Sequence, residues 1–197
     1  MIGFLRGVLM GKTPPKLIID VQGVGYEVDA PMSTFFKLPD TGAELTLLTH
    51  LIVREDQHTL YGFSSDEERV LFRELLKVNG VGAKMALAIL SALSVDDFSH
   101  CVQVEDKATL CKVPGVGRKT AERLIVDMRD RIEPIAEAVA SNVVSGGDVQ
   151  GEAFNALVSL GYKSTEARKM LQSIPDDLSS TEDMLQAALS AAAPGRQ

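Results

Sequence analysis

The sequence predicts an α+β protein with a small β-barrel, a helical middle domain and a short helical C-terminal domain. Residues 1–64 alternate short β-branched or aromatic runs with turn residues, whereas residues 65–134 and 151–197 carry apolar side chains at helical spacing. We therefore expect a domain in each of these three ranges. Residues 135–150 are predicted to be a flexible linker, because they contain Ser145-Gly146-Gly147 and show no strong periodicity.

Five predicted strands fill the first domain. Turn residues separate them, notably Pro14-Pro15, Gly23 and Pro39-Asp40-Thr41-Gly42. Five short strands in about 60 residues suit a small closed barrel, and the OB-fold is the commonest five-stranded choice. The predicted strands are residues 2–9, 16–21, 24–30, 45–53 and 58–63.

Helical patterns begin at Ser65. This residue precedes Asp66, Glu67 and Glu68, which predicts a helix N-terminus because a serine cap and acidic side chains favour the positive end of the helix dipole. Glycine pairs separate the later helices of this domain, which include residues 85–93 and 120–131. After the linker, predicted helices at residues 152–160, 165–173 and 182–192 indicate a three-helix domain.

Charge is unevenly distributed along the chain. The net charge is −7, but residues 65–132 hold eleven of the twenty basic residues together with eleven acidic ones, so this segment is neutral. Residues 133–197 carry four basic and nine acidic residues. The middle segment is therefore the better candidate for contact with phosphates, and the acidic C-terminal segment suits a protein partner.

An internal repeat carries the strongest functional signal. Val78-Asn79-Gly80-Val81-Gly82-Ala83-Lys84 recurs 35 residues later as Val113-Pro114-Gly115-Val116-Gly117-Arg118-Lys119, and each copy lies between two predicted helices. Gly-x-Gly lets the backbone approach a ligand closely, and the next helix offers free N–H groups to an anion. A single copy is more typical of a glycine helix cap with solvated lysines. Two copies with the same downstream lysine favour two phosphate-binding sites.

Other chemistries lack the residues that they need. The segment from Gly115 to Thr120 is not a P-loop, because Arg118 stands where a glycine must precede the lysine, so we expect no intrinsic ATP hydrolysis. We expect no metal and no cofactor either, because the candidate ligands are scattered and lack a ligand spacing. These ligands are His50, His58, His100, Cys101 and Cys111. Without a signal-peptide pattern or an apolar run of about 20 residues, a cytoplasmic protein with no membrane contact is expected.

The repeat resembles the tandem helix-hairpin-helix of DNA repair proteins. The chain as a whole resembles the RuvA family, the Holliday-junction-binding subunits of the bacterial branch-migration complex, with motifs in family order over nearly its full length. The matching residues are Val24-Gly25-Tyr26-Glu27-Val28, Val53-Arg54-Glu55-Asp56, Leu60-Tyr61-Gly62-Phe63, Asn79-Gly80-Val81-Gly82, Pro114-Gly115-Val116-Gly117, Lys119-Thr120-Ala121-Glu122-Arg123-Leu124 and Leu160-Gly161-Tyr162.

The resemblance implies a non-catalytic, DNA-binding subunit that acts in recombination, DNA repair and the SOS response. It implies a homotetramer built by the barrel, acting as one tetramer or two, which binds four-way junction DNA without reading its sequence. The implied protein partners are the hexameric ATPase RuvB, which is the motor of branch migration, and the junction resolvase RuvC. The implied phosphate-binding residues are Asn79, Gly80, Gly82, Lys84, Gly115, Gly117, Arg118, Lys119 and Arg123. The implied motor-binding residues are Leu157, Leu160, Tyr162 and Leu189.

Two carboxylates are expected at the tip of a hairpin. Glu55 and Asp56 lie between the predicted strands that end at Val53 and begin near His58. In a tetramer four such tips would cluster on the central axis and repel phosphates, which disfavours a continuous duplex more than an open junction. The resemblance implies the same role, an acidic pin at the junction centre, with Arg54 offsetting part of the repulsion.

Two other functions remain open at this point. Pro114 to Ala121 also resembles the hairpin of helix-hairpin-helix DNA glycosylases, with Glu137 as the nearby carboxylate, but that family's Val-Asp-Thr-His stretch and four-cysteine cluster are missing. A plain duplex-binding module whose barrel binds single strands is the other alternative. It would use exposed aromatic side chains on the strands. The candidates are Phe4, Tyr26, Tyr61 and Phe63.

Overall fold

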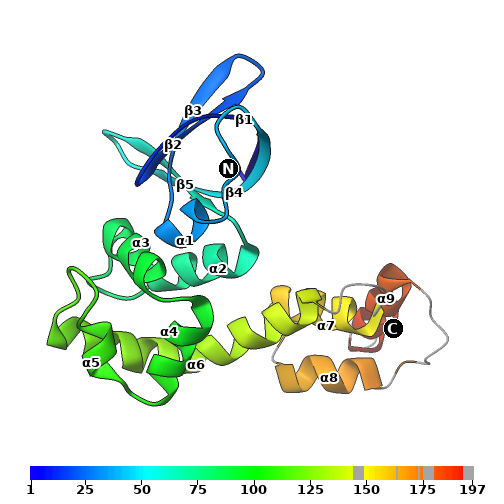
Figure 1. Ribbon diagram of the computed structural model, residues 1–197. Helices are drawn as coiled ribbons and strands as arrows, with labels where there is room; N and C mark the ends of the chain where they lie inside the picture. The colour runs from blue at the N-terminus through cyan, green and yellow to red at the C-terminus, as the bar shows by residue number, and fades with distance from the viewer. Residues whose placement is uncertain (144–148, 163, 173, 175–179, 193–197) are drawn as a thin grey trace. The chain divides into compact units, whose positions relative to one another are not determined.

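The computed structural model describes residues 1–143, 149–162, 164–172, 174 and 180–192 (Figure 1). Two compact units are present, Met1–Ile135 and Ala136–Gln197. No single helix in the described ranges is long and apolar enough to span a membrane, although one pair of helices bent by 97° reaches that length and composition together.

The N-terminal strands close into a barrel in the order β1-β2-β3-β5-β4. Strands β3 and β5 pair in parallel, and the other neighbours pair antiparallel. This arrangement confirms the predicted five-stranded barrel. The strands are β1 (Phe4–Thr13), β2 (Lys16–Val21), β3 (Val24–Asp29), β4 (Glu44–Val53) and β5 (His58–Phe63).

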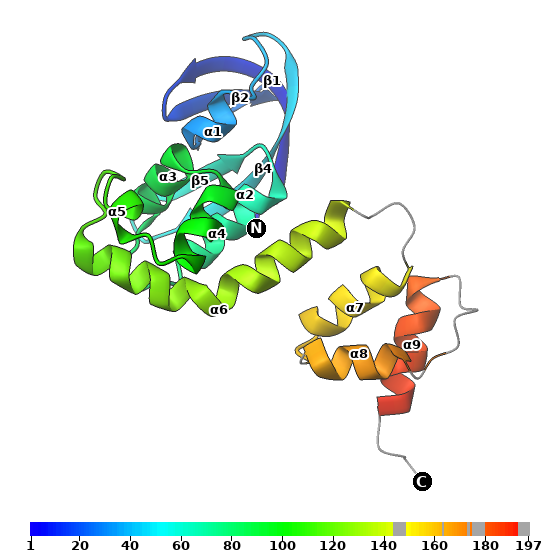
Figure 2. The same ribbon diagram turned by 60° about the horizontal axis from the view of Figure 1, so that its bottom comes forward.

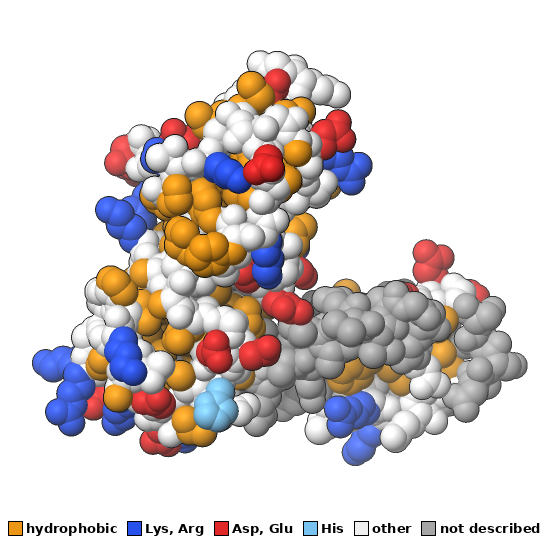
Figure 3. All heavy atoms as spheres, in the orientation of Figure 1, with side chains coloured by type: hydrophobic (Ala, Val, Ile, Leu, Met, Phe, Trp, Pro, Cys, Tyr) orange, Lys and Arg blue, Asp and Glu red, His pale blue; other side chains and the backbone are white. Residues whose placement is uncertain are grey.

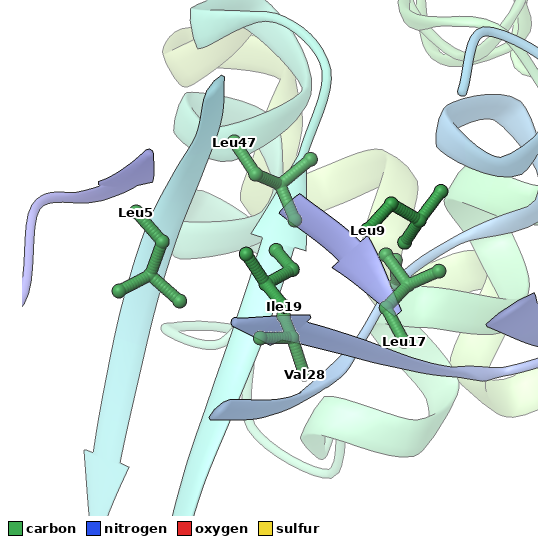
Figure 4. Packing of buried hydrophobic residues seen from close by; sticks show 7 residues of the cluster. Leu5, Leu9, Leu17, Ile19, Val28 and Leu47 are labelled. Carbon is green, nitrogen blue, oxygen red and sulfur yellow. The ribbon is translucent and has the colours of Figure 1, made fainter. Parts of the chain in front are cut away.

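The barrel interior is filled by leucine, isoleucine and valine side chains from alternate strand positions, because successive residues of a strand point to opposite faces. These side chains converge on one another in Figure 4. They are Leu5, Leu9, Leu17, Ile19, Val28 and Leu47. Strand β1 extends past its predicted end at residue 9. A register shift between Leu9 and Gly11 lets it continue with Met10 exposed, so the extension carries no regular alternation that the sequence pattern could reveal.

A short helix, α1 (Met32–Phe35), and helix α2 (Asp66–Leu75) join the barrel to the helical domain. Ser65 caps α2 as the sequence predicts, since its side chain accepts a hydrogen bond from the backbone N–H of Glu68. The ring of Phe72 on α2 lies 5.0 Å from Tyr61 and 4.9 Å from Phe63, centroid to centroid. This aromatic contact fixes α2 against β5.

The rest of the first unit is helical. Its helices are α3 (Ala83–Ala92), α4 (Val95–Gln103), α5 (Lys107–Leu110) and most of α6 (Arg118–Val143), whose last residues belong to the second unit. Helices α2 and α3 lie next to the barrel and α1, and α4 and α5 lie beside the N-terminal part of α6 (Figures 1 and 2). Helix α6 runs beyond its predicted end at residue 131 and into the predicted linker, although Pro134 removes one backbone donor. The alanine-rich run from Ala136 to Ala140 has a high helix propensity, which outweighs the missing periodicity.

The second unit contains α7 (Val149–Ser159), α8 (Ser164–Gln172) and α9 (Thr181–Ala192). Leu157, Ala167, Met170 and Ala188 form its buried core. These helices match the predicted C-terminal helices closely. Residues 144–148 of the predicted linker and the predicted helix end at residue 173 lie outside the described residues.

Candidate nucleic-acid interface

The internal repeat folds into two hairpin turns with the same backbone hydrogen bond. In the first turn the N–H of Val81 donates to the carbonyl of Val78 at 3.0 Å, and in the second Val116 donates to Val113 at the same distance. All four valines are buried. The apolar positions of the repeat therefore anchor each turn in the core and leave the glycines at the surface.

One glycine in each turn is required by backbone conformation. Gly80 has φ of +88° and Gly115 has φ of +87°, in the left-handed region that side chains with a Cβ rarely adopt. These residues reverse the chain so that the next helix begins at the tip of the hairpin. Their role is local and would be needed with or without a ligand.

The other two glycines have no such explanation in the fold. Gly82 has φ of −95°, and Gly117 is not among the glycines with positive φ. A Cβ built on either residue would meet no atom within 4 Å. Open space at these positions lets an external group approach the backbone closely.

Each turn presents the N-terminus of a helix whose dipole is left uncompensated. Gly82 caps α3 without a side-chain hydrogen bond, and neither α3 nor α6 has an acidic residue in its first turn. Helix α2, by contrast, has three. The second residue is Lys84 in α3 and Lys119 in α6. Free N–H groups and a lysine at one helix end form a site for an anion.

The basic side chains of this region fall into two groups. Over the described part of the chain, Lys84 and Lys119 have no ion pair within 4.0 Å. The other predicted cations are already engaged: Arg118 Nε lies 3.6 Å from Glu122 Oε1, and Arg123 Nη1 donates to the carbonyl oxygen of Asn79 at 2.9 Å. Among the predicted cations, which all lie in the described ranges, Lys84 and Lys119 are therefore the two that neither pair with an acidic side chain nor contact the carbonyl oxygen of Asn79.

Basic side chains gather at the edge formed by α5 and the start of α6 (Figure 3). Glu122 lies within this group and contacts Lys107 Nζ at 3.4 Å as well as Arg118. Near the first hairpin, burial raises the pKa of the Asp29 carboxyl, while the positive charges of Lys16 and Lys84 partly lower it. The charge of Lys84 is thus felt at the end of strand β3.

Three family models match the chain in succession. They are the RuvA N terminal domain over residues 1–62, the SAM-like helix-hairpin-helix tandem over residues 72–130 and the RuvA C-terminal domain over residues 148–193. A relative from Thioalkalivibrio sulfidiphilus, named Holliday junction branch migration complex subunit RuvA, is 52% identical over 198 residues, which cover 97% of this chain and 98% of the relative. Relatives of the same name from Methylococcus capsulatus and Pseudomonas aeruginosa are 51% and 49% identical, and cover 98% and 96% of this chain and 99% and 98% of their own. The chain belongs to the RuvA family.

The acidic pair that the RuvA resemblance singles out lies in the turn between β4 and β5. The N–H of Arg54 donates to the carbonyl of Gln57 at 2.8 Å, which leaves Glu55 and Asp56 as the two residues of the tip. Arg54, Glu55 and Asp56 are all exposed. The hairpin thus presents two carboxylates and one guanidinium to solvent.

The motor-binding residues suggested by the RuvA resemblance differ in exposure. Leu157 is fully buried, Tyr162 and Leu189 pack partly buried against the core, and Leu160 is 63% exposed. Helix α7 ends in a Schellman motif, with Gly161 at φ +99° and the N–H of Tyr162 donating to the carbonyl of Leu157 at 3.2 Å. Leu157 and Tyr162 therefore have a structural role at this helix end, whereas Leu160 is available to a partner.

The 35-residue offset of the repeat also separates the two groups of basic residues. Lys84 and Lys119 are equivalent in the repeat, but Arg118 and Arg123 correspond to Ala83 and Ala88. Arg118 and Arg123, which have no basic equivalent in the first copy, are the two that already contact Glu122 and Asn79 within the chain. The same offset pairs Lys77 with Lys112, which we did not single out, and Lys77 contacts Glu74 at 2.5 Å.

Proposed function

We propose that this chain is a non-catalytic subunit that holds four-way junction DNA by its backbone phosphates and recruits a motor ATPase. The observation that carries the proposal is the duplicated anion site, in which two hairpins present the same uncapped helix end with an unpaired lysine at the same position. Two such sites side by side suit the two strands of one duplex arm. Backbone contacts of this kind position a protein without reading sequence.

Each site is built to receive a phosphate closely. The bare Cα atoms of Gly82 and Gly117 leave open space in front of the helix N-terminus, and Lys84 or Lys119 supplies the opposite charge. The phosphate contacts that we propose involve Asn79, Gly80, Gly82, Lys84, Gly115, Gly117 and Lys119, with Arg118 available if it exchanges Glu122 for a phosphate.

A tetramer formed through the barrel would bind DNA more tightly than one subunit can with its two phosphate sites. Fourfold symmetry matches a four-armed DNA, and linked sites gain affinity through effective concentration. The hairpin tips with Glu55 and Asp56 would then lie at the junction centre as an acidic pin, with Arg54 beside them. The relatives named above are subunits of a Holliday junction branch migration complex, which supports this assembly for the present chain.

The second unit is the proposed motor-binding part, acting on the ATPase RuvB through Leu160 with support from Tyr162 and Leu189. Its net negative charge suits a protein rather than DNA. We place the protein in the bacterial cytoplasm, with RuvC as a further partner. Family membership favours this function over the glycosylase alternative, for which the side chain of Glu137 lies outside the described part of the chain.

The salt dependence of junction binding tests the phosphate sites. Lys84→Ala and Lys119→Ala should each lower the slope of log affinity against log salt by about 0.9 for every phosphate contact removed. Fluorescence anisotropy with labelled junctions of two unrelated sequences would measure this, and both sequences should respond alike. Lys37→Ala, which removes an exposed lysine in the turn after α1, is the matched control. An unchanged slope in both variants would remove these lysines from the interface.

A further inference from the structure

We propose that Arg123 is a positioning residue, which holds the first hairpin turn at a fixed distance from the second, rather than a phosphate ligand as the family resemblance suggested. The inference rests on the proposed function, because it concerns the spacing of the two phosphate sites. It assigns to this arginine a role inside the protein that can be measured without DNA.

The guanidinium of Arg123 lies over the first turn. Its Nη1 donates to the carbonyl oxygen of Asn79 at 2.9 Å, and a Cβ built on Gly80 would lie 3.5 Å from the same nitrogen. Arg123 belongs to α6, the helix whose N-terminus forms the second site with Lys119. One rigid helix therefore carries part of the second site and also contacts the first.

The contact is matched from the opposite side. A Cβ built on Gly115, the left-handed glycine of the second turn, would lie 4.0 Å from Cε of Met85. Met85 follows Lys84 in α3, the helix that begins at the first turn. Each left-handed glycine thus lies beside a side chain from the helix that follows the other hairpin. We call these two contacts, of Arg123 with the first turn and of Met85 with the second, the brace.

The brace matters because the two sites act together. Phosphates on the two strands of a duplex have a fixed geometry, and a second contact adds affinity only if its site is already in place. The repeat itself supplies no such tie, because the residue equivalent to Arg123 in the first copy is Ala88. Only the second copy of the repeat therefore carries this arginine, and its side chain reaches the first copy.

Hydrogen exchange in the DNA-free protein tests the brace directly. The amides of Val81 and Val116 form equivalent hydrogen bonds in the two turns, so each is an internal control for the other. Arg123→Ala should speed exchange of the first turn about threefold to tenfold and leave the second unchanged, as expected for the loss of one hydrogen bond. Arg123→Lys keeps a donor and should keep most of the protection. Arg129→Ala, which removes another arginine of α6, paired with Glu105, should change neither turn.

Junction binding by the same variants separates the two possible roles of Arg123. A positioning residue should weaken binding severalfold with little change in the salt slope, whereas a phosphate ligand should lower the slope by about 0.9 per contact. The loss should also be less than additive with Lys84→Ala, in the turn that it holds, and additive with Lys119→Ala. Unchanged exchange at the first turn in Arg123→Ala would overturn the inference. If exchange rises as expected but neither lysine variant alters DNA binding, the brace stands and the proposed phosphate sites fail.

Discussion

The hydroxyl of Thr34 on α1 donates a hydrogen bond to the carboxylate of Glu68 on α2 at 3.0 Å, and both residues are buried. The same carboxylate oxygen accepts from the backbone N–H of Ser64 at 3.2 Å and from its hydroxyl at 3.0 Å. This network lies at the joint between the barrel and the helical domain. It fixes the direction in which α2 leaves β5, and so the placement of the hairpins relative to the barrel.

Removing this carboxylate should loosen the joint. Glu68→Ala leaves the buried hydroxyl of Thr34 without its acceptor and removes the hydrogen bonds from Ser64, which should lower the free energy of unfolding by about 2 kcal/mol. Urea unfolding followed by circular dichroism, at one protein concentration, would measure the change. Glu67→Ala, in the same helical turn, is the control and should cost less than about 1 kcal/mol. Equal effects of the two substitutions would show that the network adds nothing beyond the helix dipole.

Stability should also depend on pH through His50. Burial, followed by the charges of Arg73 and Arg69, lowers the pKa of His50 below its ordinary value of 6.5. Arg73 Nε donates to His50 Nδ1 at 3.3 Å, a contact that needs the neutral ring. Because the folded protein disfavours protonation, the contribution of His50 is complete above pH 6.5 and is lost as the pH falls below it toward the lowered pKa.

The measurement is the urea midpoint at about pH 7.5 and about pH 5 for the parent and His50→Gln. We expect the parent to lose more stability between the two values than the variant does. His100, an exposed histidine of α4, supplies the control substitution His100→Gln, which should keep the pH dependence of the parent. A parent and a His50 variant with parallel pH profiles would contradict the assignment.

Much of the fold follows from local sequence signals, and what was missed has physical causes. Strands β2 and β5 occupy the predicted residues because turn residues bound them on both sides. Strand β1 extends past its predicted end because a bulge breaks the alternation of buried and exposed residues. Helix α1 was not predicted because it is too short to show a helical period. The repeat points to the hairpins, and the Arg118–Glu122 pair is a local i, i+4 contact of one helix. The contacts of Arg123 with Asn79 and of Glu68 with Thr34 depend on tertiary packing that no local pattern encodes.

Substitution by alanine should have different effects at the two glycines of the second hairpin. At Gly115 it should lower stability, and at Gly117 it should lower DNA binding. Gly115→Ala forces a side chain into the left-handed region and should cost about 1–2 kcal/mol of unfolding free energy. Gly117→Ala meets open space at an allowed φ and should alter stability by less than about 0.5 kcal/mol, because lost capping and reduced unfolded-state entropy nearly cancel. Its junction affinity should nevertheless fall at least about tenfold, since the methyl group occupies the approach path of the phosphate. Full binding by Gly117→Ala would place the phosphate elsewhere.

Two leucines near the end of α7 should separate folding from partner binding. Leu157→Ala removes a fully buried side chain and should destabilise the second unit by about 2–5 kcal/mol. Leu160→Ala removes an exposed one and should leave the helix content unchanged while lowering stimulation of the motor ATPase. Circular dichroism and a steady-state ATPase assay with RuvB and junction DNA would measure both. Val158→Ala, also at an exposed position of this helix, is the control for Leu160. Normal stimulation by Leu160→Ala would move the proposed contact away from this helix end.

The acidic hairpin tip should act on the choice of DNA substrate rather than on affinity alone. Glu55 and Asp56 are exposed in a turn closed by the Arg54–Gln57 hydrogen bond, so both carboxylates face solvent and any DNA that lies across the tip. Around a fourfold axis, eight such charges would repel a continuous duplex, whose phosphates pass over the centre, more than an open junction. Neutralising them as Glu55→Gln with Asp56→Asn should therefore strengthen duplex binding more than junction binding and lower the junction-to-duplex affinity ratio.

The comparison needs one fixed salt concentration, since charge repulsion is screened within about 10 Å at 0.1 M. Asp40→Asn with Glu44→Gln is the matched control, because it removes two exposed carboxylates where β4 begins, at the other end of the strand that leads to the tip. The control changes the net charge by the same amount, so a general gain in DNA affinity would appear in both double variants. A fall in the ratio confined to the Glu55 and Asp56 variant would identify the tip as the element that selects junctions. An equal response of the two double variants would show that the tip is a solvated turn with no role in selecting junctions.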